Sequence, residues 1–459
     1  MNPNAQAHTT QKQHTIKEYR TVVAISLPLL VYYLSEVAIG LTDLFIVGQL
    51  GTLELGAVGL GKTLVFGWLM VSLGILSIIS VMCSEALAQR RITEMTLTLV
   101  QGIWIAAALV GLGILLFSYT TPLFNILGYD PALTAVADEY IRWAKWMLLP
   151  ALAFGLLRNY LTVVARTRVL VAVSLAAVAA NYGLNQLLVF GRYGFPELGV
   201  TGAAVATVVV NVFSFVVLFF YTRWSEPRAM RAVLARLLQL RPVRIIELLR
   251  LGLPAGMVQS LEAGFFIIIS LLVGTFGAVW LAANNVMLAV MDVTFVIMLT
   301  LGEALAVRLA FQQGLGNRLM LQALTRFGLV VGGVIMLSAS ALLWLRPDWV
   351  LSFFLDSNAD GYAETLAATA QLAAIMAIFL LFDGYQVLTT WMLRGFKDTF
   401  IPMLLGASGY WAMGLSFGLI LAYPIGLGAV GLWWGLGIGL MFAASLLVLR
   451  LINRAWGRG

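Results

Sequence analysis

Two stretches of the sequence, SLPLLVYYLSEVAIG (residues 26–40) and GLPAGMVQSLEAG (residues 252–264), each carry a glutamate inside an apolar run, eight residues after a proline. The two glutamates are Glu36 and Glu262. A charge at the centre of a membrane-spanning helix costs roughly 2.5–3.5 kcal/mol even on a lenient insertion scale. Carboxylates kept at such positions usually face a cavity or a partner and bind ions, protons or cationic ligands. The pair therefore indicates a transporter built from two related halves.

The composition independently places the chain in a membrane. Of its 459 residues, 61% are hydrophobic and 11% are charged, and the mean hydropathy is +0.95. A soluble protein cannot cover so much apolar surface. The single cysteine, Cys83, excludes a disulfide framework and a thiolate metal cluster. Both histidines, His8 and His14, precede the first apolar run, so no histidine is expected inside the membrane.

Apolar runs long enough to span a bilayer recur along the whole chain. Twelve spans are predicted, at residues 21–47, 56–84, 95–118, 134–157, 168–190, 198–222, 246–273, 279–306, 320–345, 364–392, 399–421 and 428–451. Most of the 28 lysine and arginine residues fall in alternate loops, starting from the N-terminus. This distribution follows the positive-inside rule with both termini in the cytoplasm. The net charge of +7 thus reflects membrane topology, and no nucleic-acid partner is expected.

The two halves of the sequence align at a nearly constant offset of 226 to 229 residues. Six spans per half is an even number, so both halves enter the membrane in the same sense. The halves should then be related by an axis along the membrane normal, with a central cavity between two lobes. The aligned pairs include Pro28 with Pro254, Glu36 with Glu262, Gly51 with Gly277, Gly199 with Gly428, and Gly202 with Gly431.

The expected architecture is an all-α integral membrane protein with twelve transmembrane helices in two pseudo-symmetric six-helix lobes. Residues 1–20 are interpreted as a disordered cytoplasmic tail and residues 223–245 as a basic cytoplasmic linker that lies solvated at the headgroups. The N-terminal lobe is assigned to residues 21–222 and the C-terminal lobe to residues 246–451. Residues 452–459 form a second cytoplasmic tail.

Two nucleotide-binding patterns occur in the sequence and are rejected. Residues 56–63, GAVGLGKT, fit the phosphate-loop pattern, but they open a membrane helix, whereas phosphate-loop chemistry needs a preceding strand and a soluble pocket. Small residues for close helix packing, with Lys62 extending to the membrane interface, are the preferred explanation of the stretch. Residues 426–431, GLGAVG, fit a dinucleotide fingerprint, but no acidic residue follows them to bind a ribose. No cofactor is expected.

Ionisable and amide side chains inside the spans are the candidate functional residues. Glu36 and Asp43 are seven residues apart, which places them on nearly one helix face, and Asn181 and Asn185 share a face because they are four apart. For each acid the alternative is a structural carboxylate that pairs with a neighbouring helix. Glu85 and Glu303 lie nearer helix ends, where that alternative is favoured. The five acids embedded well within spans are Glu36, Asp43, Glu262, Asp292 and Asp383.

Residues 383–399, DGYQVLTTWMLRGFKDT, carry the most specific resemblance to a known family. With RLGLP at residues 250–254, Asp43, and Asn181 and Asn185 followed by PELG at 196–199, they resemble the multidrug and toxic compound extrusion (MATE) transporters of the bacterial NorM-like branch. The resemblance extends from about Tyr19 to Leu451. It implies twelve helices in two lobes in the bacterial inner membrane, and export driven by a sodium or proton gradient.

The resemblance also implies roles for particular residues. Glu262 and Asp383 match the cation-coupling carboxylates of the C-terminal lobe, where sodium is a possible ligand. Asp43 matches the acid of the N-terminal lobe that is linked to protonation. Three positions depart from the family pattern: Glu36 stands where relatives commonly have glutamine, and Asp292 and Glu303 stand where they commonly have small or uncharged residues. These extra acids leave the choice between sodium and proton open.

The function expected from these features is secondary active export of amphipathic organic cations by antiport against sodium or protons, through alternating access. Its partners would be small organic cations, the coupling ion and membrane lipids, with the chain acting as a monomer. One alternative is a lipid-linked oligosaccharide flippase of related fold, although such proteins usually have more spans and a basic cavity. A second alternative, an intramembrane enzyme, lacks histidine in the spans and an intramembrane aspartyl-protease motif.

Glu36 is assigned a site by repeat symmetry alone. Together with Asp43 on the same helix face, it would give the N-terminal lobe an acid opposite Glu262 and a second site able to hold a proton or a cationic substrate. Asn181 and Asn185 could complete this polar site, and Asp292 is a separate candidate for substrate or proton binding. Two desolvated carboxylates so close together do not both ionise easily, so one could bind a proton. Alternatively, Glu36 only hydrogen-bonds within the bundle, with Asn181 or Asn185 as its partner.

Overall fold

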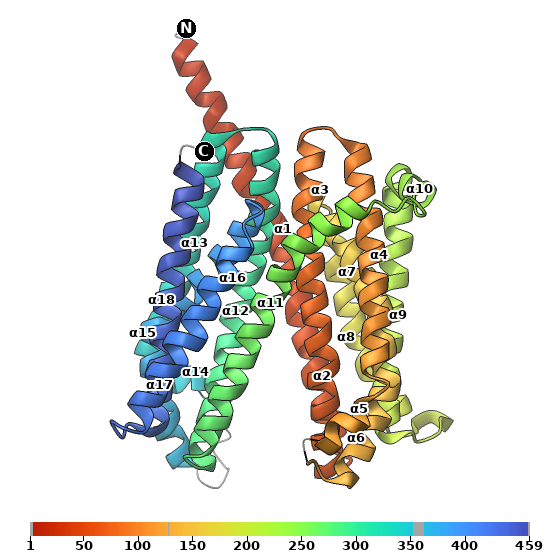
Figure 1. Cartoon of the computed structure of the whole chain (residues 1–459), viewed down its shortest axis with the longest axis vertical. Helices are drawn as coiled ribbons and strands as arrows, with labels where there is room; N and C mark the ends of the chain where they lie inside the picture. The colour runs from red at the N-terminus through yellow and green to blue at the C-terminus, as the bar shows by residue number, and fades with distance from the viewer. Residues whose placement is uncertain (1–2, 127, 352–361, 458–459) are drawn as a thin grey trace. The chain divides into compact units, whose positions relative to one another are not determined.

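The computed structural model of the chain describes residues 3–126, 128–351 and 362–457, and these residues are almost entirely helical (Figure 1). Twelve segments in these ranges are long and apolar enough to cross a membrane, which confirms the predicted number of spans. They are Lys12–Gly48, Thr52–Ala88, Ile92–Leu116, Pro131–Val163, Arg168–Leu188, Gly199–Ser225, Pro242–Gly274, Ala278–Gly314, Arg318–Leu345, Tyr362–Gly395, Phe400–Ala422 and Gly428–Trp456.

The helices of the first half begin with α1 (Pro3–Gly48), α2 (Thr52–Leu76), α3 (Ile78–Ala88) and α4 (Ile92–Leu116). They continue with α5 (Thr120–Ile126), α6 (Pro131–Ala144), the 3-10 turn η1 (Lys145–Met147), α7 (Leu148–Val163), α8 (Arg168–Leu188), η2 (Arg192–Gly194), α9 (Gly199–Ser225) and α10 (Pro227–Ala235).

The second half contains α11 (Pro242–Gly274), α12 (Ala278–Gly314), α13 (Arg318–Leu345), α14 (Pro347–Leu351) and α15 (Tyr362–Gly395). Its last two spans are formed by α16 (Phe400–Ala407), the π-helical segment η3 (Ser408–Gly414) and α17 (Leu415–Ala422), and by α18 (Gly428–Trp456).

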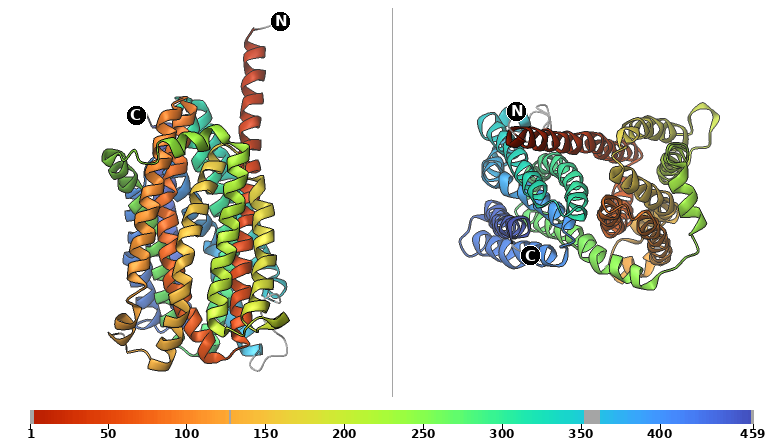
Figure 2. Two further views of the ribbon diagram at one scale, coloured as in Figure 1. Left: turned by 90° about the vertical axis from the view of Figure 1, so that its right-hand side faces the viewer. Right: turned by 90° about the horizontal axis from the view of Figure 1, so that it is seen from above.

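The polar N-terminal segment is helical where it is described, so its prediction as a disordered tail is wrong. Helix α1 begins at Pro3 and continues into the first span without interruption. Proline is well tolerated at the first position of a helix, and no glycine or proline follows until Pro28. The first turns of α1 extend beyond the neighbouring helices of the C-terminal half (Figure 2).

Contacts divide the chain into two compact units, each of which is described by itself. The N-terminal unit is Leu27–Gly256, and the C-terminal unit is Met257–Gly459 together with Met1–Ser26. Helix α1 therefore begins in one unit and ends in the other, and so does α11. In both helices the change of unit falls within two residues of a proline, Pro28 or Pro254.

In the N-terminal unit, α2 packs against α6, α8 and α7 pack against α9, and α3 packs against α4. The first turns of α11 lie close to α2, since a Cβ atom on Gly252 would be 2.5 Å from the carbonyl oxygen of Ile75. The basic segment predicted as a solvated linker is tied to α4: the Gln101 side chain donates to Gln239 O at 2.8 Å and accepts from Arg241 N at 3.0 Å. Arg244 also pairs with Glu94.

In the C-terminal unit, α15 packs against α12, α13 and α18. Three glycines four residues apart on α18, Gly431, Gly435 and Gly439, face α17 and η3. A Cβ atom on Gly439 would lie 2.5 Å from the carbonyl oxygen of Gly409. Such small-residue stripes let helix backbones approach closely inside a membrane. This approach fixes the last two spans against each other.

Matching backbone conformations confirm the register of the internal repeat. Gly51 and Gly277 precede α2 and α12 with φ angles of 153° and 112°. Gly199 and Gly428 are the first residues of α9 and α18, with φ angles of 54° and 59°. Glycine adopts positive φ without the steric cost that other residues bear. The aligned glycines are therefore required by equivalent turns in the two halves.

The N-terminal residues of α1 are anchored within the C-terminal unit. The Arg308 guanidinium on α12 donates to both carboxylate oxygens of Glu18, at 2.9 and 2.7 Å. The ring of Tyr19 stacks on Phe327 of α13 with the centroids 4.3 Å apart, and its hydroxyl donates to Ala323 O at 3.3 Å. Bidentate arginine–carboxylate pairs are among the stronger ion pairs in proteins. The start of α1 is thus part of the fold of the C-terminal unit.

Candidate functional site

Asp43 is the centre of a buried polar cluster in the N-terminal unit. The residue is 3% exposed, and its Oδ1 accepts hydrogen bonds from the amide nitrogens of Asn181 and Asn185, each at 2.9 Å. The hydroxyl of Thr207 on α9 donates to Oδ2 at 3.4 Å. Asp43 and the two asparagines on α8 thus belong to one hydrogen-bonded cluster.

Lys62 on α2 completes this cluster. Its Nζ lies 3.5 Å from Asp43 Oδ2, donates to Gly40 O at 3.1 Å and sits 5.3 Å from the centroid of the Phe66 ring. The Lys62 side chain is 15% exposed and pairs with Asp43, a contact that the prediction of an interfacial lysine did not include. The low dielectric around a buried carboxylate strengthens its Coulomb attraction for an ammonium group relative to the same pair in water.

The two asparagines each keep one group without a partner in the described part of the chain. Both amide nitrogens donate to Asp43, and the buried oxygens Asn181 Oδ1 and Asn185 Oδ1 receive no hydrogen bond. Buried polar groups normally find partners, so unpaired ones at a cluster require an explanation. Two amide oxygens and a carboxylate are oxygen ligands of the kind that hard cations prefer.

Glu36 lies outside this hydrogen-bonded cluster. It is exposed, and no described residue makes a hydrogen bond to it. The charges that act on it are those of Arg158, Lys62 and Asp43. The alternative in which Asn181 or Asn185 binds Glu36 is wrong, because both amides donate to Asp43 instead.

The acids predicted in the C-terminal lobe lie within reach of one another's charge. Glu262 on α11 is 9% exposed and Asp383 on α15 is 2% exposed. The charges of Glu262 and of Asp292, an exposed residue on α12, both act on Asp383. Asp383 Oδ2 is buried and has no hydrogen-bond partner among the residues that the structure describes. The structure thus brings together two of the proposed coupling acids and one of the extra acids.

A small cavity of about 10 Å³ lies beside Glu262. This volume is close to the minimum that a water molecule requires. Its polar lining comes from Gln259, Glu262, Gln386, Thr390 and Arg394, and neither Gln259 Oε1 nor Gln386 Oε1 has a partner in the described ranges. The lining therefore offers several oxygen atoms of the kind that a small hard cation prefers, together with the positive charge of Arg394, which opposes one. Val258, Phe295, Val387 and Trp391 form its apolar wall.

The π-helical segment η3 places two aromatic side chains next to Glu262. The ring of Tyr410 stacks on Phe265 with a centroid distance of 5.3 Å, and Trp411 Nε1 donates to Leu261 O at 3.2 Å. The Tyr410 hydroxyl lies near the Glu262 carboxylate but makes no hydrogen bond of normal geometry in the described structure. Short π-helical segments occur frequently at functional sites, where they redirect side chains.

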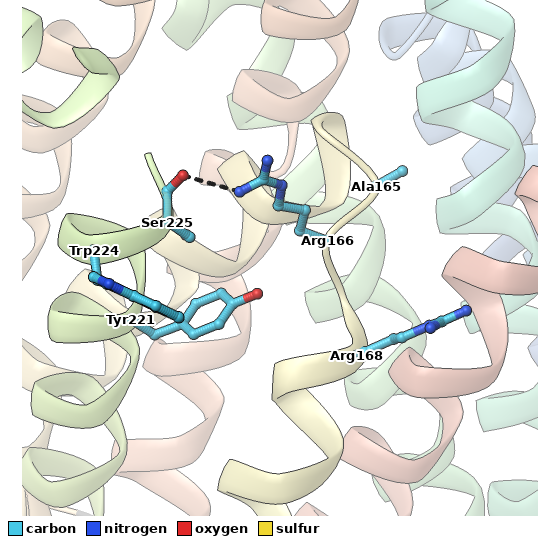
Figure 3. A pocket seen from close by; sticks show the side chains of 6 residues that line it. All are labelled: Ala165, Arg166, Arg168, Tyr221, Trp224 and Ser225. Carbon is cyan, nitrogen blue, oxygen red and sulfur yellow. Dashed lines mark hydrogen bonds between the residues drawn. The ribbon is translucent and has the colours of Figure 1, made fainter. Parts of the chain in front are cut away.

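A larger hollow of about 680 Å³ lies in the N-terminal unit, where the α7–α8 turn meets the end of α9 (Figure 3). Arg166 turns toward Ser225, donates to its carbonyl oxygen at 2.9 Å and pairs with Glu226 at 2.8 Å. The exposed Trp224 beside it is typical of a membrane–water interface. None of the predicted site residues lines this hollow.

Sequence reasoning missed three kinds of contributor. Lys62 could have been found as a lysine well inside the predicted second span, residues 56–84. Gln259 and Gln386 stand three residues from Glu262 and Asp383, which places each pair on one helix face. No signal in a single sequence distinguishes Thr207 from the other threonines in the spans.

The arrangement of helices is that of a known class of membrane transporter. The eukaryotic MATE transporter AtDTX14 superimposes with a TM-score of 0.82 at 20% identity, over 96% of this chain and 98% of that one. The Vibrio cholerae MATE transporter VcmN in its bent form gives a TM-score of 0.81 at 18% identity, with 96% and 98% covered. The fold is therefore that of the MATE transporters.

Sequence comparison identifies the family. The MatE family model matches residues 28–187 and 254–420, two segments that begin 226 residues apart, like the internal repeat. A probable multidrug resistance protein NorM of Agrobacterium fabrum (strain C58) is 33% identical over 95% of this chain and 93% of its own length. The multidrug resistance protein NorM of Burkholderia vietnamiensis is 32% identical over 93% and 92%. The chain belongs to the MATE family, in its NorM-like bacterial branch.

Proposed function

We propose that the chain is a secondary active exporter that antiports amphipathic organic cations against sodium ions or protons. The C-terminal acids carry this proposal, because Glu262 and Asp383 are buried in membrane-spanning helices beside oxygen atoms that lack partners within the described residues. The names of the NorM relatives support multidrug efflux. Coupling follows if substrate and ion compete for the same negative charge, which links their binding free energies.

In this proposal the protein works by alternating access in the bacterial inner membrane, with both termini in the cytoplasm. The alternation of arginine and lysine along the loops supports this orientation. Glu262 and Asp383 form the main coupling site, at which sodium is a possible ligand, and Asp43 provides the acid of the N-terminal unit. Glu36, Asp292, Asn181 and Asn185 contribute to substrate or proton binding.

Efflux from proteoliposomes tests the function directly. In vesicles where the cytoplasmic side of the protein faces the lumen, an imposed sodium or proton gradient is expected to drive a fluorescent organic cation such as ethidium out of the lumen. Ionophores that collapse the effective gradient should stop the efflux. Transport that ignores both gradients, or that requires ATP, would contradict the proposal. Comparing the two gradients also identifies the coupling ion.

Glu36→Gln is expected to weaken binding of organic cations by up to about tenfold, roughly 1.4 kcal/mol, without loss of stability. The substitution removes an exposed negative charge that makes no hydrogen bond in the described structure, so the fold should tolerate it. Binding measured by fluorescence polarisation checks the effect. Glu197→Gln, which removes an exposed charge from the loop before α9, is the matched control. If Glu36→Gln and the control bind organic cations with the same affinity, Glu36 does not take part in binding.

A further inference from the structure

The ammonium group of Lys62 contacts the stretch of α1 that separates two acids, Glu36 and Asp43. Its Nζ donates to the carbonyl oxygen of Gly40, which lies four residues after Glu36 and three before Asp43 on α1. The charge of Lys62 acts on Glu36 as well as pairing with Asp43.

The contact between Lys62 and Asp43 is present but not tight. Charge-assisted hydrogen bonds between nitrogen and carboxylate oxygen normally measure about 2.7–2.9 Å. The Lys62–Asp43 distance is 3.5 Å, whereas the two asparagine amides bind the other carboxylate oxygen at 2.9 Å. Asp43 is therefore held in place by Asn181 and Asn185, and Lys62 mainly neutralises its charge. Because Lys62 neutralises the Asp43 carboxylate without holding it in position, another cation can replace the Lys62 ammonium group.

The surroundings also provide for a displaced ammonium group. The Gly40 carbonyl, the face of the Phe66 ring and the exposed Glu36 carboxylate all lie within the range of Lys62 interactions. Cation–π and carbonyl contacts compensate part of the cost of leaving a carboxylate. Arg158 also acts on Glu36 and competes with Lys62 for its charge, so the Gly40 carbonyl and the Phe66 ring are the main alternative partners of the ammonium group. Lys62 can therefore leave Asp43 without becoming an isolated charge.

We infer that Lys62 is a tethered cation that occupies Asp43 in place of a transported one, so that an organic or inorganic cation reaches Asp43 only by displacing the Lys62 ammonium. The ligand class is a monovalent cation. The unpartnered Asn181 Oδ1 and Asn185 Oδ1 beside Asp43 are the further oxygens that would meet it. The inference rests on the proposed export function and gives Lys62 a role in setting the cation affinity of the N-terminal unit.

Equilibrium binding to the purified full-length chain tests this role. The probes are sodium ions and tetraphenylphosphonium, and every variant carries Asp383→Asn so that the C-terminal cluster contributes less. Lys62→Met is expected to bind at least one probe about tenfold more tightly, a size typical of coupling between ligands. Lys62→Arg, which keeps the charge, should retain the original affinity. Adding Asp43→Asn to Lys62→Met should abolish the gain.

Two results would overturn the inference. One is unchanged cation affinity in Lys62→Met, and the other is a gain that persists when Asp43→Asn is added. Lys145→Met is the control for loss of a lysine elsewhere in the N-terminal unit, where Lys145 binds only the Ser118 hydroxyl among described partners. It should leave the affinity unchanged.

A stability measurement covers the case in which Lys62→Met folds poorly. A cation that replaces the lost ammonium stabilises the native state by mass action. Tetraphenylphosphonium or sodium should therefore raise the melting temperature of Lys62→Met more than that of Lys62→Met/Asp43→Asn, and equal shifts would contradict the inference. Because these measurements use no gradient, they stand apart from the efflux assay. If these binding and stability measurements contradict the role of Lys62, the proposed export function is not affected. If no efflux is seen, the binding result can still be interpreted.

Discussion

Glu262→Gln and Asp383→Asn are each expected to reduce gradient-driven efflux to background while the protein still folds and inserts. Each change removes the negative charge and nearly keeps the shape of the side chain. A neutral amide costs less to bury than a carboxylate, so stability should not fall. The cation, in contrast, loses a buried charged ligand in a site of low dielectric, where that charge interacts most strongly.

The measurement is efflux from proteoliposomes with matched protein content, together with the melting temperature in detergent. Glu364→Gln is the control on the same helix as Asp383, because Glu364 is an exposed residue in the first turn of α15. It should transport like the unmodified chain. Normal efflux by both Glu262→Gln and Asp383→Asn would refute the assignment of the coupling site to the C-terminal unit.

Gly435→Ala is expected to destabilise the C-terminal unit strongly. A Cβ atom at this position would overlap the backbone of Gly418 and lie 2.6 Å from the carbonyl oxygen of Gly414. Both contacts are with backbone, which cannot move aside as a flexible side chain can. Overpacking of this kind typically costs about 1–3 kcal/mol, and the cost falls here on the packing of α18 against η3 and α17.

Yield of monodisperse protein and the melting temperature check this effect. Gly406→Ala is the matched control in α16, because a Cβ atom there would meet only the Tyr410 ring at an ordinary 3.9 Å. That variant should behave like the unmodified chain. A melting temperature for Gly435→Ala equal to that of the control would show that the two spans do not need their close approach.

The twelve spans were predictable because the membrane imposes them. Each backbone polar group must be satisfied within its own helix, so apolar length alone identifies a span. The repeat was predictable from Pro28, Glu36 and their counterparts. The helical state of the N-terminal segment was not, since its stability comes from contacts of Glu18 and Tyr19 with α12 and α13, residues about 300 positions away.

The acidic site was predictable in its residue types but not in its contacts. Asp43, Glu262 and Asp383 stand out because charges are rare in such helices. Whether an acid is enclosed depends on which helices cover it, and that information is not local. Asp43 is enclosed by α8, α9 and Lys62, whereas Glu36, two turns earlier on the same helix, stays exposed. A spacing of seven residues shows that two side chains point in nearly the same direction from a helix. It does not show whether neighbouring helices cover both of them.

The exchange of α1 and α11 between units bears on how a repeated protein of this kind arises. The start of α1 belongs to the C-terminal unit and the start of α11 to the N-terminal unit, in equivalent positions of the repeat. An ancestral pair of half-length chains with the same arrangement would have traded the first turns of their first helices, as swapped dimers do. Neither copy would have been complete alone. After gene fusion, the same exchange of helix segments would have taken place within a single chain. Its formation would then no longer have depended on protein concentration.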